Sequence, residues 1–308
     1  MMTPMAPRQS GSALILALLV VAIVATLASS ILWRQELWIA DIGMQREKAV
    51  LIGLARSGTD WAQAILAEDA RTSAIDHLGE AWTQKIPLIP IDEGELGGFL
   101  EDQQGRWNLN NLVRNGKADP YQFEIMQRLL ESLGLSVELA FALQDWMDGD
   151  GETSATAGAE DDFYLLLRSP YRAANAMLSH VDELRLVRGF SPDVIEKLRP
   201  FVTALPEFSA INVNTAPREV LAALQQTYSD SDLDAVTSRR ERLPFRDLAD
   251  FRGTLKKSSF DTREGLLTTA SQYFQANVAA KYKDSSIELV CMIRRHAGRT
   301  EIVWLRHT

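Results

Sequence analysis

The stretch ALILALLVVAIVATLASSIL, from Ala13 to Leu32, decides the fold of this chain. Only Thr26, Ser29 and Ser30 interrupt its apolar character. An α-helix rises about 1.5 Å per residue, so about 20 apolar residues cross the roughly 30 Å hydrocarbon core of a bilayer. The sequence therefore predicts a transmembrane helix near the N-terminus.

The segment ahead of this helix is short, contains Arg8 and no acidic residue, and ends at Gly11. Positively charged flanks stay on the cytoplasmic side, so we expect a cytoplasmic N-terminus and an exterior bulk. A cleaved signal peptide and a plain signal anchor are the two ordinary alternatives, and Ala28 would suit a cleavage site. The apolar pattern continues past Trp33, however, and this favours an anchor.

Apolar residues recur at helical spacing after the membrane segment, as far as Ile65. This spacing predicts one long helix that leaves the membrane with an apolar stripe on one side. We expect the stripe, represented by Leu37, Ala40, Met44 and Leu51, to contact partner proteins.

A short basic leader ending in glycine, followed by an apolar helix that becomes amphipathic, resembles the type IV pilins and pseudopilins. The resemblance implies that prepilin peptidase cuts after Gly11 and leaves Ser12 as a methylated N-terminus. Most pilins have a glutamate at the fifth mature position, whereas this chain has Leu16. Within the family, that absence is typical of minor pseudopilin K of the bacterial type II secretion system.

The remaining chain predicts an α+β protein. Residues 1–11 form the leader, 12–33 the transmembrane helix, and 34–115 a helix extension with a hairpin around Gln104–Gly105. Residues 116–265 look mostly helical, with helices expected at Tyr121–Leu133, Val137–Trp146, Asn175–Val187, Pro192–Thr203, Pro217–Thr227 and Leu233–Glu241. Residues 266–308 predict three closing antiparallel strands. The order resembles a type IV pilin-like fold, a long helix on an antiparallel sheet, interrupted by a large inserted α-helical domain.

The segment from Asp145 to Tyr164 is dense in carboxylates that are interleaved with small residues. Such charges repel one another unless a cation or solvent intervenes, and Ca²⁺ takes oxygens from flexible loops of this kind. The segment is not an EF-hand, because Thr153 stands where that loop requires glycine. The spacing alone leaves a calcium site and a solvated acidic loop equally open.

The same segment resembles the part of the pseudopilin K family that binds calcium. Matched by motif, the resemblance implies ligands at Asp148, Asp150, Glu160 and Asp161, with Asp145 as a further candidate. We expect Ca²⁺ to order the loop and thereby to stabilise the helical domain.

Nucleic-acid binding is the alternative function. Residues 181–198 resemble a helix-hairpin-helix module, as in a membrane-anchored DNA-binding protein of the competence type. The hairpin has only Gly189 where two glycines are usual, and the net charge of −9 disfavours backbone binding. The paired asparagines at 108, 110, 212 and 214 indicate turn and cap chemistry. Nothing identifies a nucleophile with its base, so we expect no catalysis.

The resemblance thus implies a single-pass protein of the bacterial inner membrane with its bulk in the periplasm. Its expected role is protein secretion: at the tip of the pseudopilus it would assemble with minor pseudopilins I and J and initiate or limit the filament. Prepilin peptidase and the inner-membrane secretion machinery are the other expected partners, and no nucleic acid is expected.

Overall fold

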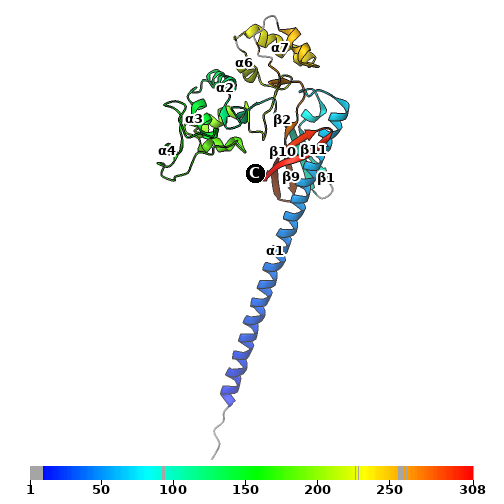
Figure 1. The fold of residues 1–308 in the computed structure, drawn as a ribbon. Coiled ribbons are helices and arrows are strands. Elements are labelled where there is room, and N and C mark those ends of the chain that lie inside the picture. Colours follow the sequence, from blue (N-terminus) through cyan, green and yellow to red (C-terminus); the bar gives the residue numbers. More distant parts are fainter. Residues whose placement is uncertain are drawn as a thin grey trace, which may run out of the picture.

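The computed structural model describes residues 10–91, 94–225, 227, 229–255, 260 and 263–307. The first nine residues of the predicted leader lie outside this set. Helix α1 (Ser10–Thr72) is one continuous helix that extends far out of the folded body (Figure 1). Gly11 and Ser12 both fall within its first turn. The predicted long helix is therefore confirmed, and it runs about two turns beyond the expected stripe.

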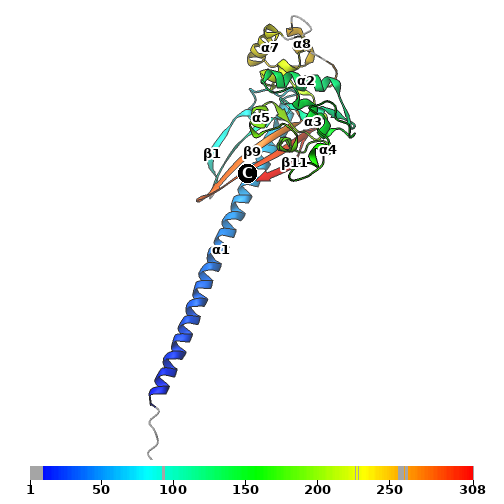
Figure 2. The same ribbon diagram turned by 90° about the vertical axis from the view of Figure 1, so that its left-hand side faces the viewer.

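An antiparallel sheet packs on the C-terminal part of α1 (Figure 2). Its strand order is β1-β2-β9-β10-β11, and every neighbouring pair is antiparallel. Apolar side chains of α1 such as Ala55 and Leu66 are fully buried against it. The strands are β1 (Ile86–Ile91), β2 (Gly94–Asp102), β9 (Tyr273–Tyr282), β10 (Ser285–His296) and β11 (Arg299–His307).

The predicted hairpin around Gln104–Gly105 is wrong. The hairpin of this region is formed by β1 and β2, upstream of that turn. Strand β2 has β1 on one side and β9 on the other, so no edge remains for the residues that follow. Trp107 and Asn108 form β3 and pair in parallel with β6 (Val202–Thr203). Trp107 is fully buried among the helices, where its indole N–H donates to Gln122 at 2.9 Å.

The helical insertion has its own hydrophobic core. That core includes Trp107 and Val113, which precede the expected boundary at residue 116, and it also takes in Leu267 beyond the other boundary at 265. Its main helices are α2 (Pro120–Ser132), α3 (Leu139–Met147), α4 (Asp161–Tyr164), α5 (Pro192–Leu198), α6 (Arg218–Ala223), α7 (Asp230–Arg242) and α8 (Leu248–Thr254).

Two helix predictions need correction, and one helix was missed. The expected helix at 175–187 is only a 3₁₀ helix at Val181–Leu186, because backbone groups upstream of it bond to side chains elsewhere. The helix expected at 192–203 ends at Leu198, since Pro200 disfavours a helical residue before it. Helix α8 was not predicted, because its seven residues are too few to show a clear period.

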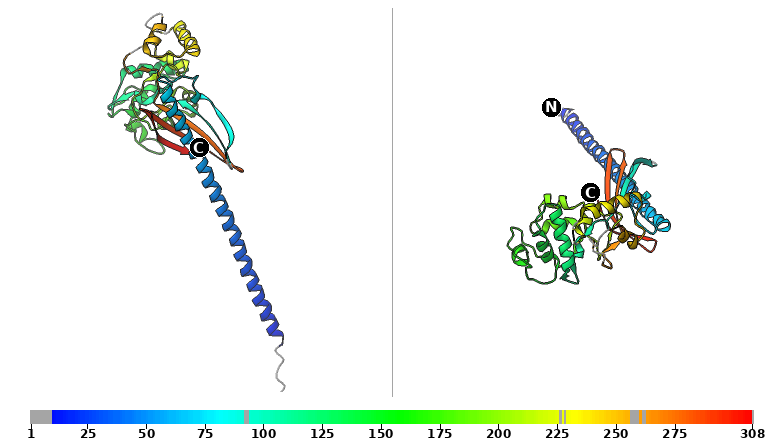
Figure 3. Two further views of the ribbon diagram at one scale, coloured as in Figure 1. Left: turned by 90° about the vertical axis from the view of Figure 1, so that its right-hand side faces the viewer. Right: turned by 90° about the horizontal axis from the view of Figure 1, so that it is seen from above.

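The short remaining elements join these parts. They are η1 (Ala81–Thr83), η2 (Leu109–Asn111), β4 (Val113–Arg114), β5 (Lys117–Ala118), β7 (Ile211–Asn212) and β8 (Leu267–Thr268). Viewed along the vertical axis, the helical part lies to one side of the sheet and α1 to the other (Figure 3). Met292 of β10 accordingly packs away from α1, against Leu205 and Tyr273.

A buried polar network fixes the junction between α1, the sheet and the insertion. Arg295 of β10 forms ion pairs with Asp76 at 2.5 Å and with Asp69 at 2.7 Å. Asp76 also accepts the Ser271 N–H, and the Ser271 hydroxyl donates to Asp102. The acidic group near the end of α1 therefore already has its cation in Arg295, and it calls for no metal ion.

Candidate functional site

The acidic loop connects the end of α3 to the start of α4, and aromatic side chains hold both of its ends together. Trp146, at the end of α3, meets Tyr164 of α4 edge to face, with ring centroids 5.0 Å apart. Tyr171 stacks on Tyr164 at 5.3 Å. Trp146 and Tyr164 are both almost completely buried. The loop is thus anchored on a packed base, which brings acidic residues far apart in sequence to one place.

Three of the five predicted ligands lie together. One carboxylate oxygen of each of Asp148, Asp150 and Glu160 lies within 4.8 Å of those of the other two. Asp148 and Glu160 are buried, while Asp150 is exposed. Carboxylates this close destabilise one another in the charged state unless a cation or protons compensate them.

The electrostatics of the cluster reflect that repulsion. Burial raises the pKa of Asp148 to about 6, and the negative charges of Asp150 and Asp145 add to this effect. Burial, followed by the charges of Asp145 and Asp148, raises the pKa of Glu160 to about 7. Asp148 Oδ1 and Glu160 Oε1 are buried and take no hydrogen bond from any described residue. Buried polar atoms usually have partners, so these two oxygens fit a bound cation.

Asp145 lies next to the cluster but has a different role. It is fully buried, and its Oδ1 accepts the backbone N–H of Ser154 at 3.1 Å as well as the Ser154 hydroxyl. Its other oxygen lies so close to Gly158 that a β-carbon at that position would clash with it. Burial also raises the pKa of Asp145, against the lowering effect of these hydrogen bonds. Asp145 therefore shapes the loop from inside.

Asp161, the fifth predicted ligand, is not brought into the cluster. Its Oδ1 accepts the Ala173 N–H at 3.0 Å, and its Oδ2 lies 3.3 Å from Arg172. It fastens the start of α4 to the following segment. Arg188 was not predicted as part of the site, although its guanidinium donates to the Gly158 carbonyl at 2.8 Å. Arg188 lies 30 residues from Gly158, so no local pattern could have revealed it.

The predicted partner-binding stripe on α1 divides into two parts. Leu37 and Met44 are 51% and 63% exposed, and Ala40 is exposed as well. Leu51, in contrast, is only 6% exposed and packs with Leu96 on the chain's own sheet. Leu51 therefore belongs to the fold, and the stripe that is available to partners ends before it.

The comparisons with known proteins agree with one another. Residues 105–207 and 211–276 match two models described as type II secretion system (T2SS), protein K. The chain is 36% identical over 298 residues to type II secretion system protein K of Pseudomonas aeruginosa, a match that covers 93% of this chain and 89% of that protein. It is 29% identical to the protein of the same name from Aeromonas hydrophila, covering 93% of each.

A solved structure has the same fold. The match is to a chain of the GspK-GspI-GspJ complex from the type 2 secretion system of enterotoxigenic Escherichia coli, with a TM-score of 0.76. It covers 86% of this chain and 98% of that chain, at 24% sequence identity. The predicted pilin-like architecture, a long helix on a sheet with a helical insertion, is thereby confirmed.

Proposed function

The chain belongs to the family of type II secretion system protein K, and we propose that it caps the tip of the periplasmic pseudopilus as a minor pseudopilin. In this role it assembles with minor pseudopilins I and J and initiates or limits the filament. The chain supplies packing surfaces for protein secretion and performs no chemistry of its own.

One observation carries this proposal: the large apolar side chains on the N-terminal half of α1 are not covered by any other described element. Large apolar side chains from Leu14 to Met44 are exposed, and the described part of the chain has no other helix that is long and apolar enough to cross a membrane. About 20 of these residues suit the bilayer, whereas Leu37 and Met44 lie beyond it. Such a surface must be covered by lipid before assembly and by other helices afterwards.

Two features favour the tip over positions within the filament. Leu16 replaces the acidic residue that would otherwise seek a neighbouring N-terminal amine, so α1 lacks a buried charge that needs a partner. The helical insertion also enlarges the body at the end opposite the free half of α1 (Figure 1). A body of that size leaves little room for another subunit stacked above it.

The membrane and processing partners follow from the same helix. We place the chain in the inner membrane as a single-pass protein, with Arg8 and the leader in the cytoplasm and the folded body in the periplasm. Prepilin peptidase would cut between Gly11 and Ser12, after which the inner-membrane secretion machinery would extract the subunit.

The intact mass of the membrane-extracted chain tests the processing step. Cells with prepilin peptidase should yield a chain that lacks residues 1–11 and carries a methyl group on Ser12, whereas cells without it should yield the full chain. A cut near Ala28 in both strains would refute the proposal. The Gly11→Val variant is the control and should keep its leader in both strains.

Cross-linking tests the assembly step. Met44→Cys presents a thiol on the free part of α1, and Asp60→Cys presents one on the exposed side of the same helix beside the sheet. With minor pseudopilins I and J co-expressed, a bifunctional thiol–amine reagent should join Met44→Cys to them. Equal cross-linking of Asp60→Cys would contradict a surface restricted to the free half.

The competence-type alternative is not favoured. In the segment that resembles a helix-hairpin-helix module, Arg199 lies 2.7 Å from Asp182 and 2.9 Å from Glu196. Cations paired in this way have little charge left for phosphate.

We further propose that the cluster of Asp148, Asp150 and Glu160 binds Ca²⁺. Its donors are hard oxygens on a loop that has glycines, and two of those oxygens are buried without a hydrogen bond from the described residues. The bound ion would compensate the repulsion between the carboxylates and hold the loop on the aromatic base. Its role would be structural.

Calcium binding has a built-in reporter in Trp146, which is 3% exposed and adjoins the cluster in sequence. Titration of the chelator-treated full chain with Ca²⁺ should change Trp146 fluorescence, identified as the difference from Trp146→Phe. At 100 times the Kd, the ion should add about 2.7 kcal/mol to the unfolding free energy of the helical part. Glu160→Gln should abolish both effects, and an unchanged melting temperature in wild type would refute the site.

A further inference from the structure

The two edges of the sheet differ in their capacity to pair with another strand. Strand β1, at one edge, contains Pro87 and Pro90, which lack the N–H that a neighbouring strand would bind. Strand β11, at the other edge, contains no proline and carries the apolar run from Ile302 to Leu305. Ile302 and Leu305 are each 38% exposed. Exposed apolar edges of this kind are sites where extended segments add to a sheet.

A β-bulge in β11 turns its C-terminal half toward the other face of the sheet. Ile302 pairs with Ile293, but Met292 pairs with Trp304, so Val303 is an extra residue. Without that residue, Trp304 would share the α1 side of the sheet with Ile302, since side chains alternate along a strand. The bulge instead places Trp304 and Arg306 on the outer face.

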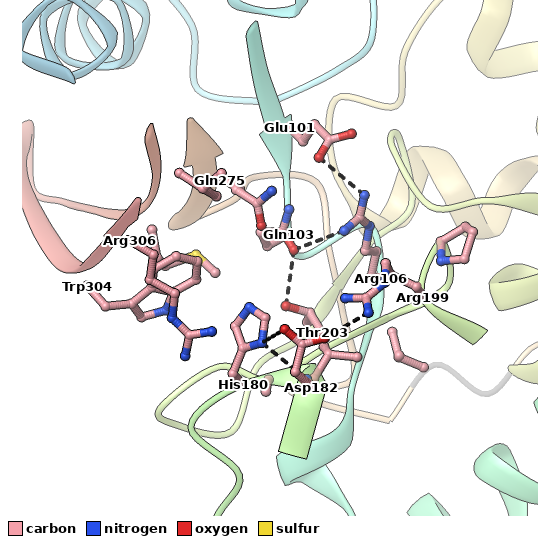
Figure 4. Close-up of a pocket in the computed structure, with 16 residues that line it drawn as sticks. Glu101, Gln103, Arg106, His180, Asp182, Arg199, Thr203, Gln275, Trp304 and Arg306 are labelled. Carbon is pink, nitrogen blue, oxygen red and sulfur yellow. Dashed lines mark hydrogen bonds and ion pairs between the residues drawn. The ribbon is translucent and has the colours of Figure 1, made fainter. Parts of the chain in front are cut away.

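On that face they line a cleft of about 560 Å³ between the sheet and the helical insertion (Figure 4). His180, from the insertion, meets the Trp304 ring edge to face at 5.5 Å. The Arg306 guanidinium lies 5.1 Å from the centre of the same ring. The apolar floor of the cleft includes Val290 and Met292.

The cleft has one cation that no carboxylate of the described residues compensates, although the chain has a net charge of −9. Arg106, Arg199 and Arg306 line it, against the carboxylates of Glu101 and Asp182. Those two carboxylates already pair with Arg106 and Arg199, at 3.4 Å and 2.7 Å. Within the described residues, no carboxylate lies within ion-pair distance of Arg306.

A buried amide adds an unused donor to this cleft. Gln103 is 2% exposed, and its carbonyl oxygen accepts from Arg106 and from the Thr203 hydroxyl. Those two bonds fix the orientation of the amide, and its Nε2 donates to no described residue. A group with acceptors only, such as a carboxylate, would therefore meet an unused amide donor of Gln103 and the cation of Arg306 in this cleft.

We propose that β11 and this cleft form a docking site for an extended, acidic segment of a partner protein. The segment adds as a further antiparallel strand along Trp304–His307. A side chain directly opposite Arg306 lies on the same face of the sheet, so a glutamate or aspartate there enters the cleft and pairs with Arg306. The site lies on the outer face of the sheet, away from α1, and it does not depend on the role proposed for α1.

Labelled heptapeptides test the proposal on the full-length chain in detergent micelles. Each peptide alternates threonine and valine and has capped ends, and its central residue is either glutamate or lysine. The glutamate peptide should bind roughly tenfold more tightly, because reversing the charge replaces attraction by repulsion at a partly desolvated site. Its binding should slow amide hydrogen exchange at Trp304–His307.

Two charge reversals on the same strand make the test specific. Arg306→Glu should invert the preference between the two peptides. Arg299→Glu, the same change at the far end of β11 and outside the cleft, should leave it unaltered. Equal binding of both peptides, no binding at millimolar concentration, or equal effects of the two variants would overturn the proposal. Binding of the glutamate peptide without slower amide exchange at Trp304–His307 would overturn the strand pairing.

Discussion

Asn110→Ala should be among the most destabilising single changes in the helical insertion. The Asn110 side chain is almost fully buried, and its Oδ1 accepts the Leu178 N–H at 2.8 Å. Its Nδ2 donates to the carbonyl groups of Leu178 and Leu205, both at 2.8 Å. The asparagine thus holds two loops together through backbone hydrogen bonds that a neighbouring strand would otherwise supply.

The magnitude follows from the groups that the substitution leaves without partners. Three buried backbone groups each lose a hydrogen bond, and an unsatisfied buried group costs about 1–3 kcal/mol. The carbonyl groups can recover part of this loss from water, so we expect roughly 3–5 kcal/mol in total. Asn110→Asp should cost at least as much, because it keeps the acceptor for Leu178 but replaces the donor with a buried charge.

Urea unfolding of the full chain, followed by near-ultraviolet signals of the helical part, measures this change as a shift of the midpoint at constant slope. Hydrogen exchange at Leu178 shows whether the loss is local. Gln84→Ala is the control, since it truncates an exposed amide and should change the unfolding free energy by less than about 0.5 kcal/mol. A loss below about 1 kcal/mol in Asn110→Ala would refute the view that this side chain replaces a strand.

Three further predictions concern the acidic cluster, α1 and the thiol. Gly158→Ala should weaken calcium binding by displacing a buried carboxylate, whereas Gly151→Ala, where a β-carbon meets nothing within 4 Å, should not; calcium titration compares them. Leu51→Ala should cost about 2–4 kcal/mol in urea unfolding, and Leu37→Ala should spare stability but reduce cross-linking to partners. Burial raises the pKa of Cys291 to about 11, so its thiolate fraction at pH 8 is ~10⁻³. Alkylation should be slow until denaturant exposes the thiol, and fast native labelling at pH 8 would contradict this.

The long helix was predictable because its determinants are local. The apolar run and the stripe that follows it act on neighbouring residues, and α1 runs through both. The limit of the free stripe was not predictable from the same pattern. Leu37 and Leu51 belong to the same apolar pattern in the sequence. Leu51 is buried and Leu37 is exposed because only Leu51 lies beside the sheet.

The acidic loop was predictable as a cluster but not in its internal division of roles. Carboxylate density showed where charge would gather, and Asp148, Asp150 and Glu160 do lie together. Density could not show that Asp145 is satisfied by Ser154 or that Asp161 faces a different segment. Those assignments depend on how the loop closes on its aromatic base.

The asparagines show most clearly why the insertion could not be derived from its pattern. Asn111 exchanges both hydrogen bonds with the backbone of Ser209, and Asn214 does the same with Phe245. Each side-chain amide donates one hydrogen bond to a backbone residue and accepts one from it, as a residue of a neighbouring strand would. A single amide therefore takes the place of strand pairing at that point. Such a contact joins residues 98 and 31 positions apart and leaves no period in the sequence. Hydrophobic spacing places the helices, but these amides decide how the loops between them are held.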